Sequence, residues 1–155
     1  NGTAVNITSV DAGLFDQVSD GWTGPELVVN GGFDSGDLSQ WSTANTLISV
    51  VDNTLEAVTS LAANTARVDI VIDKGAYIFS WDAVSVSAGV LKYSVFNISL
   101  GEQYIPTTTY SLGSISVNVD VTGAGNVGFY VLRDTGSIAT SVYDNVSVKR
   151  LLEVV

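Results

Sequence analysis

The segment S-I-S-V-N-V-D-V, residues 114–121, alternates polar and apolar side chains without a break. Because successive side chains of a β-strand point to opposite faces, this pattern predicts a strand with one buried and one solvent-facing side. The buried side is expected to hold Ile115, Val117, Val119 and Val121. A strand of this kind needs a second layer of structure to cover its apolar face.

Similar runs continue along the chain from residue 26. β-Branched residues and short apolar runs predict further strands at Glu26–Val29, Thr46–Val51, Thr54–Val58, Arg67–Ile72, Ala76–Val86, Val90–Asn97, Asn126–Arg133 and Thr140–Leu151. Turn residues separate many of these runs, and no segment has the period of a helix longer than a turn or two. The fold class is therefore expected to be all-β, with two antiparallel sheets packed as a sandwich over residues 26–155.

Alternation also predicts which side chains enter the core. Two runs near the C-terminal end are expected to bury Val127, Phe129 and Val131, and Val142, Val146 and Val148. The aromatic residues Tyr77, Phe79 and Trp81 share one face of the longest predicted strand, and three large rings in one row favour a core position over an exposed binding platform.

Residues 1–25 differ from the rest of the chain. They contain four glycines and no sustained period, which predicts an extended N-terminal arm whose large side chains are Phe15 and Trp22. Those two residues are candidates for docking to a protein partner. The sequence contains no methionine, so the chain is expected to be a processed product or part of a longer one.

Composition narrows the chemistry. The 155 residues include no cysteine and no histidine, which excludes disulfides, thiolate nucleophiles, a Ser-His-Asp triad and His- or Cys-ligated metals. The formal charge of −10 argues against nucleic acid as a partner, because phosphates require clustered Lys and Arg. No stretch has the roughly 20 continuous apolar residues of a membrane span.

Three segments carry a resemblance to a known family. They are L-V-V-N-G-G-F-D-S-G at residues 27–36 with Trp41 after it, K-G-A-Y-I-F-S-W-D-A at 74–83, and V-Y-D-N-V-S-V at 142–148. In this order they resemble carbohydrate-binding modules of the cellulose- and xylan-binding jelly-roll type. The resemblance implies a jelly-roll sandwich used as a binding or structural module, a scaffold also found in phage virion surface proteins.

The same resemblance implies a structural calcium ion. In such modules a carboxylate after the N-G-G-F turn and the aspartate of the last strand often lie together around Ca²⁺, and these residues would be Asp34 and Asp144 here. Oxygen ligands suit this hard cation. The alternative is that Asp34 caps its own turn and Asp144 is a solvated or hydrogen-bonded strand residue.

A glycan site would need exposed rings beside polar side chains. Phe96 and Tyr130 lie opposite the apolar faces of their predicted strands, so they are candidates to line an outer cleft together with Asn118 and Asn145. The alternative is that the two rings are scattered surface aromatics or fill a minor core. The four glutamates form no motif of jelly-roll glucanases, and we expect no enzymatic activity.

Two functions are consistent with these features. The first is a non-catalytic structural or adhesion domain on the surface of a larger assembly, a phage virion above others, docked to capsid or tail subunits through the arm. The alternative is a carbohydrate-binding module of a secreted bacterial glycoside hydrolase that binds a β-glucan or xylan-type polysaccharide. The expected location is accordingly the virion surface or the extracellular space.

Overall fold

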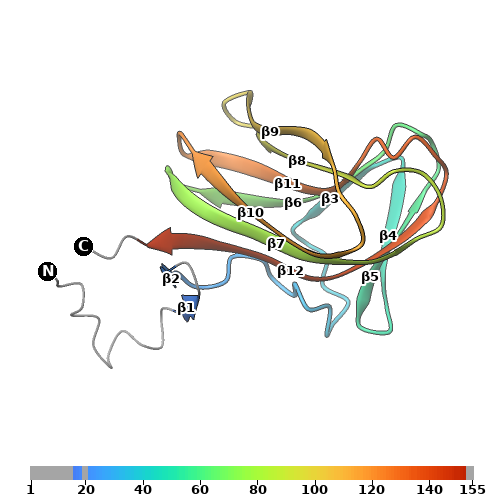
Figure 1. Cartoon of the computed structure of the whole chain (residues 1–155), viewed down its shortest axis with the longest axis horizontal. Coiled ribbons are helices and arrows are strands. Elements are labelled where there is room, and N and C mark those ends of the chain that lie inside the picture. The colour runs from blue at the N-terminus through green and yellow to red at the C-terminus, as the bar shows by residue number, and fades with distance from the viewer. Residues whose placement is uncertain (1–15, 19–20, 153–155) are drawn as a thin grey trace, which may run out of the picture.

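The computed structural model describes residues 16–18 and 21–152, and these residues form two antiparallel β-sheets packed face to face (Figure 1). One sheet has the strand order β10 (Gly113–Val121), β7 (Gly75–Val86), β12 (Thr140–Leu152), β5 (Thr54–Thr59), β4 (Thr46–Val51). The other has the order β3 (Trp41–Ala44), β6 (Thr65–Ile72), β11 (Gly125–Arg133), β8 (Lys92–Asn97), β9 (Glu102–Thr109). The prediction of an all-β sandwich is confirmed.

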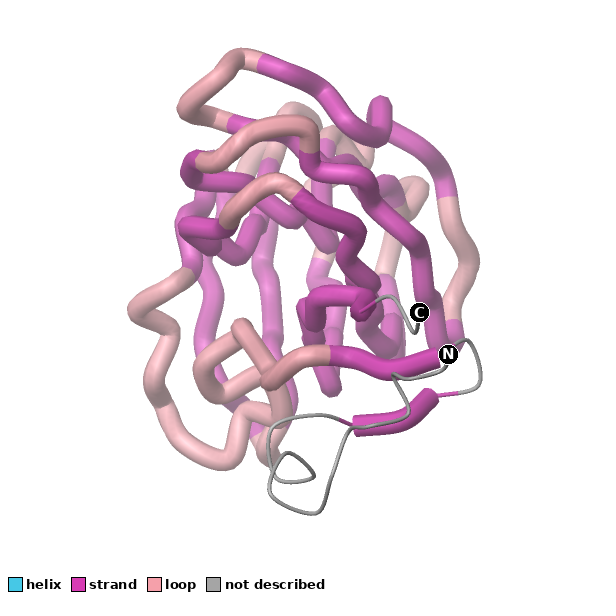
Figure 2. The backbone as a smooth tube through the Cα atoms, turned by 90° about the vertical axis from the view of Figure 1, so that its left-hand side faces the viewer, coloured by secondary structure: helices cyan, strands magenta, loops and turns pink. Residues whose placement is uncertain are grey.

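Strands and loops account for the whole of the described chain (Figure 2). Among the described residues, accordingly, no helix is long and apolar enough to cross a membrane. Two short strands, β1 (Asp16–Val18) and β2 (Gly21–Thr23), form a small hairpin that joins the first sheet at the end of β12.

The core lies between the two sheets and is rich in aromatic side chains. Tyr77, Phe79 and Trp81 are 2%, 0% and 1% exposed, which confirms that this row is core and not a binding platform. Phe79 stacks on Trp81 with their ring centroids 4.5 Å apart, and it contacts Phe129 of the opposite sheet at 5.0 Å. Contacts of this kind add to the hydrophobic free energy that holds the sheets together.

One predicted core position is wrong. Val142 is half-buried, whereas its neighbour Tyr143 is fully buried together with Val146 and Val148. The reason is an irregularity in the pairing of β12 with β7, where Asn145 adopts a φ of 49° and adds one residue to the strand. A bulge of this kind shifts the alternation of side chains by one position.

The N-G-G-F turn attaches the start of the sandwich to its last strand. Asn30 and Phe33 both have positive φ, and Phe33 N–H donates to the Asn30 carbonyl at 3.0 Å, which directs the Phe33 ring into the core. The Gly31 carbonyl accepts a hydrogen bond from Val146 N–H at 2.9 Å. A Cβ on Gly31 would lie 1.9 Å from the Val146 carbonyl oxygen, so only glycine allows this approach.

Residues 26–29 are not a strand, contrary to prediction, but they run along β12. Leu27 N–H donates to the Val148 carbonyl at 3.0 Å. The Glu26 carboxylate accepts from Val148 N–H at 2.9 Å and from the Ser147 hydroxyl at 2.5 Å, besides two backbone N–H groups of its own segment. These charge-assisted bonds fasten the segment to the sheet.

Candidate functional site

The outer surface of the second sheet brings arginines and aromatic rings together. Register places Tyr130 of β11 beside Arg67 of β6 and Ser94 of β8, and the next outward row joins Asp69, Gly128 and Phe96. We call this surface the Tyr130 face and define it by its outward-facing residues: Ser42, Arg67, Asp69, Lys92, Ser94, Phe96, Gln103, Gly128, Tyr130 and Arg133.

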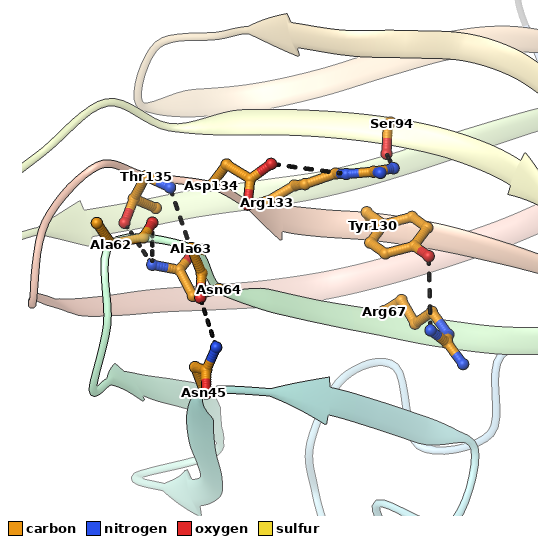
Figure 3. Close-up of polar contacts among 10 residues, drawn as sticks. All are labelled: Asn45, Ala62, Ala63, Asn64, Arg67, Ser94, Tyr130, Arg133, Asp134 and Thr135. Carbon is orange, nitrogen blue, oxygen red and sulfur yellow. Dashed lines mark hydrogen bonds and ion pairs between the residues drawn. The ribbon is translucent and has the colours of Figure 1, made fainter.

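Two arginines cover the ring of Tyr130 (Figure 3). The guanidinium carbon of Arg133 lies 4.8 Å from the ring centroid, and that of Arg67 lies 5.7 Å from it. Arg67 Nη1 also donates to the Tyr130 hydroxyl at 3.5 Å. Tyr130 as a whole is only 7% exposed, so it anchors two cations and does not offer an open ring for stacking.

A β-bulge places Arg133 on this face. The pairing of β11 with β6 shifts between Tyr130 and Leu132, and both Val131 and Leu132 are fully buried. Strict alternation from Tyr130 would direct residue 133 into the core. The extra residue reverses that direction, so Arg133 Nη1 reaches the outer surface and donates to the Ser94 hydroxyl at 2.9 Å.

Arg67 is held by a carboxylate on the same strand. Its Nε donates to Asp69 Oδ1 at 2.7 Å, and the other carboxylate oxygen accepts from the Ser42 hydroxyl of β3 at 2.5 Å. Burial disfavours the charged form of Arg67, but the hydrogen bond and charge of Asp69, with a smaller effect of Tyr130, outweigh it and raise the pKa of Arg67. Arg67 is therefore a fixed, charge-paired support for the ring.

Gly128 and Phe96 form the adjoining part of the surface. A Cβ on Gly128 would lie 3.0 Å from Arg67 Cδ and 3.3 Å from Tyr130 Cε1, so those two side chains lean over the glycine. Phe96 lies beside Gly128 across the β11–β8 pair and is half-buried. Its partner on β9 is Gln103, an exposed amide. Phe96 thus supplies a partly open apolar ring next to polar groups, an arrangement that suits a sugar.

The four predicted ligand-binding residues do not line one cleft, and that grouping is corrected. Phe96 and Tyr130 meet on the Tyr130 face, whereas Asn118 lies exposed on β10 and Asn145 on β12, both in the opposite sheet. The amide of Asn145 donates to Asp82 Oδ2 at 2.8 Å. The physical reason is topological, because β10 and β12 both pair with β7 and not with β8 or β11.

Sequence reasoning missed Arg67, Asp69, Gly128 and Arg133 as members of this surface. The sequence did contain a signal for Arg67 and Asp69: they alternate with apolar residues along one predicted strand, which predicts that they face outward. Those apolar residues are Val68, Ile70 and Ile72. Arg133 had none, since only the bulge brings it to the outer side.

Calcium at Asp34 and Asp144 stays a prediction. Asp34 is exposed, and Asp144 Oδ1 accepts from Asn145 N–H at 2.8 Å. A metal site built from side chains alone needs three or more carboxylates close together. Within the part of the chain that the structure describes, no such group exists. The nearby carbonyls of Ser35 and Asp37 already accept from the Asn30 amide, at 2.8 and 3.0 Å.

The two predicted docking residues, Phe15 and Trp22, belong to the N-terminal arm. Phe15 lies outside the described residues, and for Trp22 the structure describes the backbone, which pairs with Gln17 of β1 and Leu152 of β12. The Gly24 N–H donates to the Arg150 carbonyl at 2.8 Å. The described end of the arm is therefore hydrogen-bonded to its own sandwich. Docking of the arm to another protein stays a prediction.

Two hollows lie away from the Tyr130 face, around the end of β12. One of about 270 Å³ is lined by Pro25, Leu27, Val71, Tyr77 and Arg150 among others, and one of about 320 Å³ by Gly75, Ala76, Arg150, Leu151 and Leu152. They share Leu152 and Arg150. The guanidinium carbon of Arg150 is 5.9 Å from the Tyr77 ring centroid, and its Nη2 donates to the Lys74 carbonyl. Neither holds a predicted ligand-binding residue.

Solved structures share this fold, although no protein-family model and no curated protein matches the sequence. The CBM22-1 xylan-binding domain from Paenibacillus barcinonensis Xyn10C superposes with a TM-score of 0.63 at 14% identity, covering 83% of this chain and 96% of that domain. The N-terminal cellulose-binding domain of Cellulomonas fimi β-1,4-glucanase C gives 0.60 at 14% identity, covering 82% and 98%. A structure of the CBM22-1 and GH10 modules of a Clostridium thermocellum endo-1,4-β-D-xylanase, complexed with xylohexaose, gives 0.59 at 16%, covering 84% and 29%. The resemblance of the three sequence segments to carbohydrate-binding modules is thus confirmed at the level of the fold.

Proposed function

We propose that this chain is a non-catalytic polysaccharide-binding module that acts outside the cell and binds its ligand on the Tyr130 face. The observation that carries the proposal is the meeting of Phe96, Gly128 and the covered Tyr130 on one outer sheet surface. The ring of Phe96 can contact the apolar face of a sugar, while the hydroxyls, amide and guanidinium groups around it can bond sugar hydroxyls.

The likeness to solved structures supports this choice of function over the virion role. The matches described above are binding domains and modules named for xylan or cellulose, or taken from glycanases. Nothing in these matches supports capsid or tail subunits as partners, so the alternative function from the sequence has the better support. The fold gives no support for catalysis, since these two matched structures are a xylan-binding domain and a cellulose-binding domain.

Affinity gel electrophoresis tests the proposal directly. The wild-type chain is run through native gels that contain a soluble xylan, a β-glucan, a mannan or a uronic-acid polysaccharide, and retardation is compared with a gel without polysaccharide. We expect retardation in at least one gel and its loss in the Phe96→Ala variant. Retardation in none of the gels, with a folded protein, would overturn the proposal.

A matched variant separates the Tyr130 face from the rest of the surface. Leu47→Ala also removes a large apolar side chain, but Leu47 is 73% exposed on β4 of the opposite sheet. This variant should bind as the wild type does. If Leu47→Ala weakened binding and Phe96→Ala did not, the ligand would lie on the other sheet and the proposed location would be wrong.

A further inference from the structure

Charge is distributed unevenly between the two sheets. The chain has six Lys and Arg against sixteen Asp and Glu. Three of those six cations, Arg67, Lys92 and Arg133, lie on strands of the sheet that bears the Tyr130 face, against two carboxylates, Asp69 and Glu102. The five main strands of the opposite sheet hold two cations and four carboxylates, Glu56, Asp82, Asp120 and Asp144. With Asp134, which directly follows β11, the cations and carboxylates of this sheet balance at three each, so the Tyr130 face is less negative than the opposite sheet of this acidic protein.

Arg133 is the cation of this face that is positioned but poorly neutralised. The Tyr130 ring and the Ser94 hydroxyl hold its guanidinium plane. Its closest carboxylate, Asp134 Oδ2, is 4.0 Å from Nε, the outer limit of an ion pair, and that carboxylate is itself half exposed. Such pairs contribute little, so Arg133 keeps most of its capacity for a further anion.

The Arg133 side chain is partly open to solvent. Its side chain is 28% exposed, and Nη2 makes no hydrogen bond to the described residues. Arg67 differs, since Asp69 lies 2.7 Å from its Nε and balances its charge. An anion on this face would therefore bind to Arg133, with Arg67 as the positioning residue that fixes Tyr130.

Arg133 and the ring of Phe96 are close enough for one saccharide chain to contact both. Arg133 contacts Ser94, and Phe96 lies two residues farther along the same strand, a separation of about 7 Å at the usual rise of a strand. A saccharide chain can thus place one ring on Phe96 and the charged substituent of the same or the next ring at Arg133.

On this basis, and resting on the function proposed above, we infer that the ligand of the Tyr130 face is an acidic polysaccharide whose uronate carboxylates bind Arg133. A planar guanidinium pairs with a planar carboxylate through two parallel hydrogen bonds, which gives both affinity and orientation. A sulfate ester offers similar oxygens, so the test must distinguish the two groups.

Isothermal titration calorimetry with four soluble polymers makes this distinction: polygalacturonate, alginate, dextran sulfate and a neutral β-glucan. We expect at least one carboxylated polymer to bind at least tenfold more tightly than the neutral one and more tightly than dextran sulfate, with affinity that falls as NaCl is raised. Tightest binding of dextran sulfate would overturn the assignment to carboxylates.

Variants test whether the carboxylated polymer binds at Arg133. Arg133→Gln should lose at least tenfold in affinity for the carboxylated polymer, and Arg133→Lys should lose part of it because a lysine keeps the charge without the fork. Arg150→Gln is the matched control, since it removes an arginine that also lies over a tyrosine ring but on the opposite sheet. It should bind as the wild type does, and a loss in Arg150→Gln alone would contradict the inference. Thermal unfolding of each variant verifies that it is folded.

The outcomes also separate this inference from the proposed function. Equal or tighter binding of the neutral β-glucan, with loss in Phe96→Ala but not in Arg133→Gln, would overturn the acidic ligand and leave a polysaccharide-binding module. Binding of none of the polymers here or in the gels would overturn both.

Discussion

The guanidinium of Arg133 lies 4.8 Å from the centre of the Tyr130 ring, although the two residues are three positions apart on one strand. In a regular strand they would point to opposite faces. The bulge between Tyr130 and Leu132 brings them together and so creates the cation–aromatic pair at the centre of the Tyr130 face. Bulges often redirect a side chain beside a functional site in this way.

Phe96 gives the first prediction. Replacing it with alanine removes the open ring of the Tyr130 face, and the affinity for the bound polysaccharide should fall about tenfold, equivalent to about 1.4 kcal/mol. Because Phe96 is half-buried, the free energy of unfolding should fall by only about 1–2 kcal/mol, less than for a core phenylalanine. Titration calorimetry and urea unfolding measure the two quantities, and unchanged affinity would remove Phe96 from the site.

The second prediction concerns the N-G-G-F turn. Gly31→Ala would push a methyl group to 1.9 Å from the Val146 carbonyl oxygen, so the turn must move away from β12. Overpacking of this kind should lower the free energy of unfolding by about 1–3 kcal/mol or more. Gly32→Ala is the matched control, because its Cβ would meet nothing within 4 Å, and its effect should stay within about 0.5 kcal/mol. Equal stability of the two variants in urea unfolding would contradict this packing.

The third prediction concerns alkaline pH. Burial raises the pKa of both Tyr110 and Tyr143 above the ordinary value of 10.0. Below pH 10 both tyrosines are protonated whether the chain is folded or not, so their contribution to stability is complete there. Above pH 10 the unfolded chain loses these protons first, and the free energy of unfolding should fall by up to about 1.4 kcal/mol per pH unit for each tyrosine.

Urea unfolding across the alkaline range measures that slope. Tyr110→Phe should be less stable at neutral pH, because it loses the hydrogen bond to the Val131 carbonyl, but its stability should decline less steeply above pH 10. An unchanged slope in this variant would show that Tyr110 does not titrate with unfolding.

The fourth prediction keeps the calcium site suggested by the sequence. If Asp34 and Asp144 hold a structural Ca²⁺, EDTA should lower the melting temperature and added CaCl₂ should restore it, because an ion that binds only the folded state stabilises that state. Asp144→Ala should remove the response to EDTA, whereas Asp120→Ala on β10 should keep it. A melting temperature indifferent to EDTA would contradict a structural calcium.

The sequence predicted most of the sandwich because many of its strands alternate regularly between polar and apolar residues. The strand Thr46–Val51 matches β4 residue for residue, and Ser114–Val121 differs from β10 by one residue. Four strands were not predicted: β1 and β2 of the N-terminal hairpin, and β3 and β9 at the edges of the second sheet. β1, β2 and β3 have only three or four residues, too few to show alternation, and β9 holds Pro106 and a run of threonines where alternation is weak.

The site was less predictable than the fold, for a local reason. Phe96 and Tyr130 followed from simple alternation, and the structure brings them together. The bulges at Val131 and Asn145 leave no recognisable pattern in the sequence, yet they decide the directions of Arg133 and Val142. The pairing of Asn118 and Asn145 with the other two residues failed because the strand order of a sandwich depends on long-range contacts.

Chemical-shift mapping tests the central claim most directly. Backbone amide resonances of the wild-type chain are assigned and followed by nuclear magnetic resonance while an oligosaccharide of the polymer that binds in the gels is added. The account predicts that the shifts concentrate at Phe96, Gly128, Tyr130 and Arg133, with Asn118 and Leu47 of the opposite sheet unchanged. Shifts confined to the opposite sheet, or to the hollows around Arg150, would contradict it.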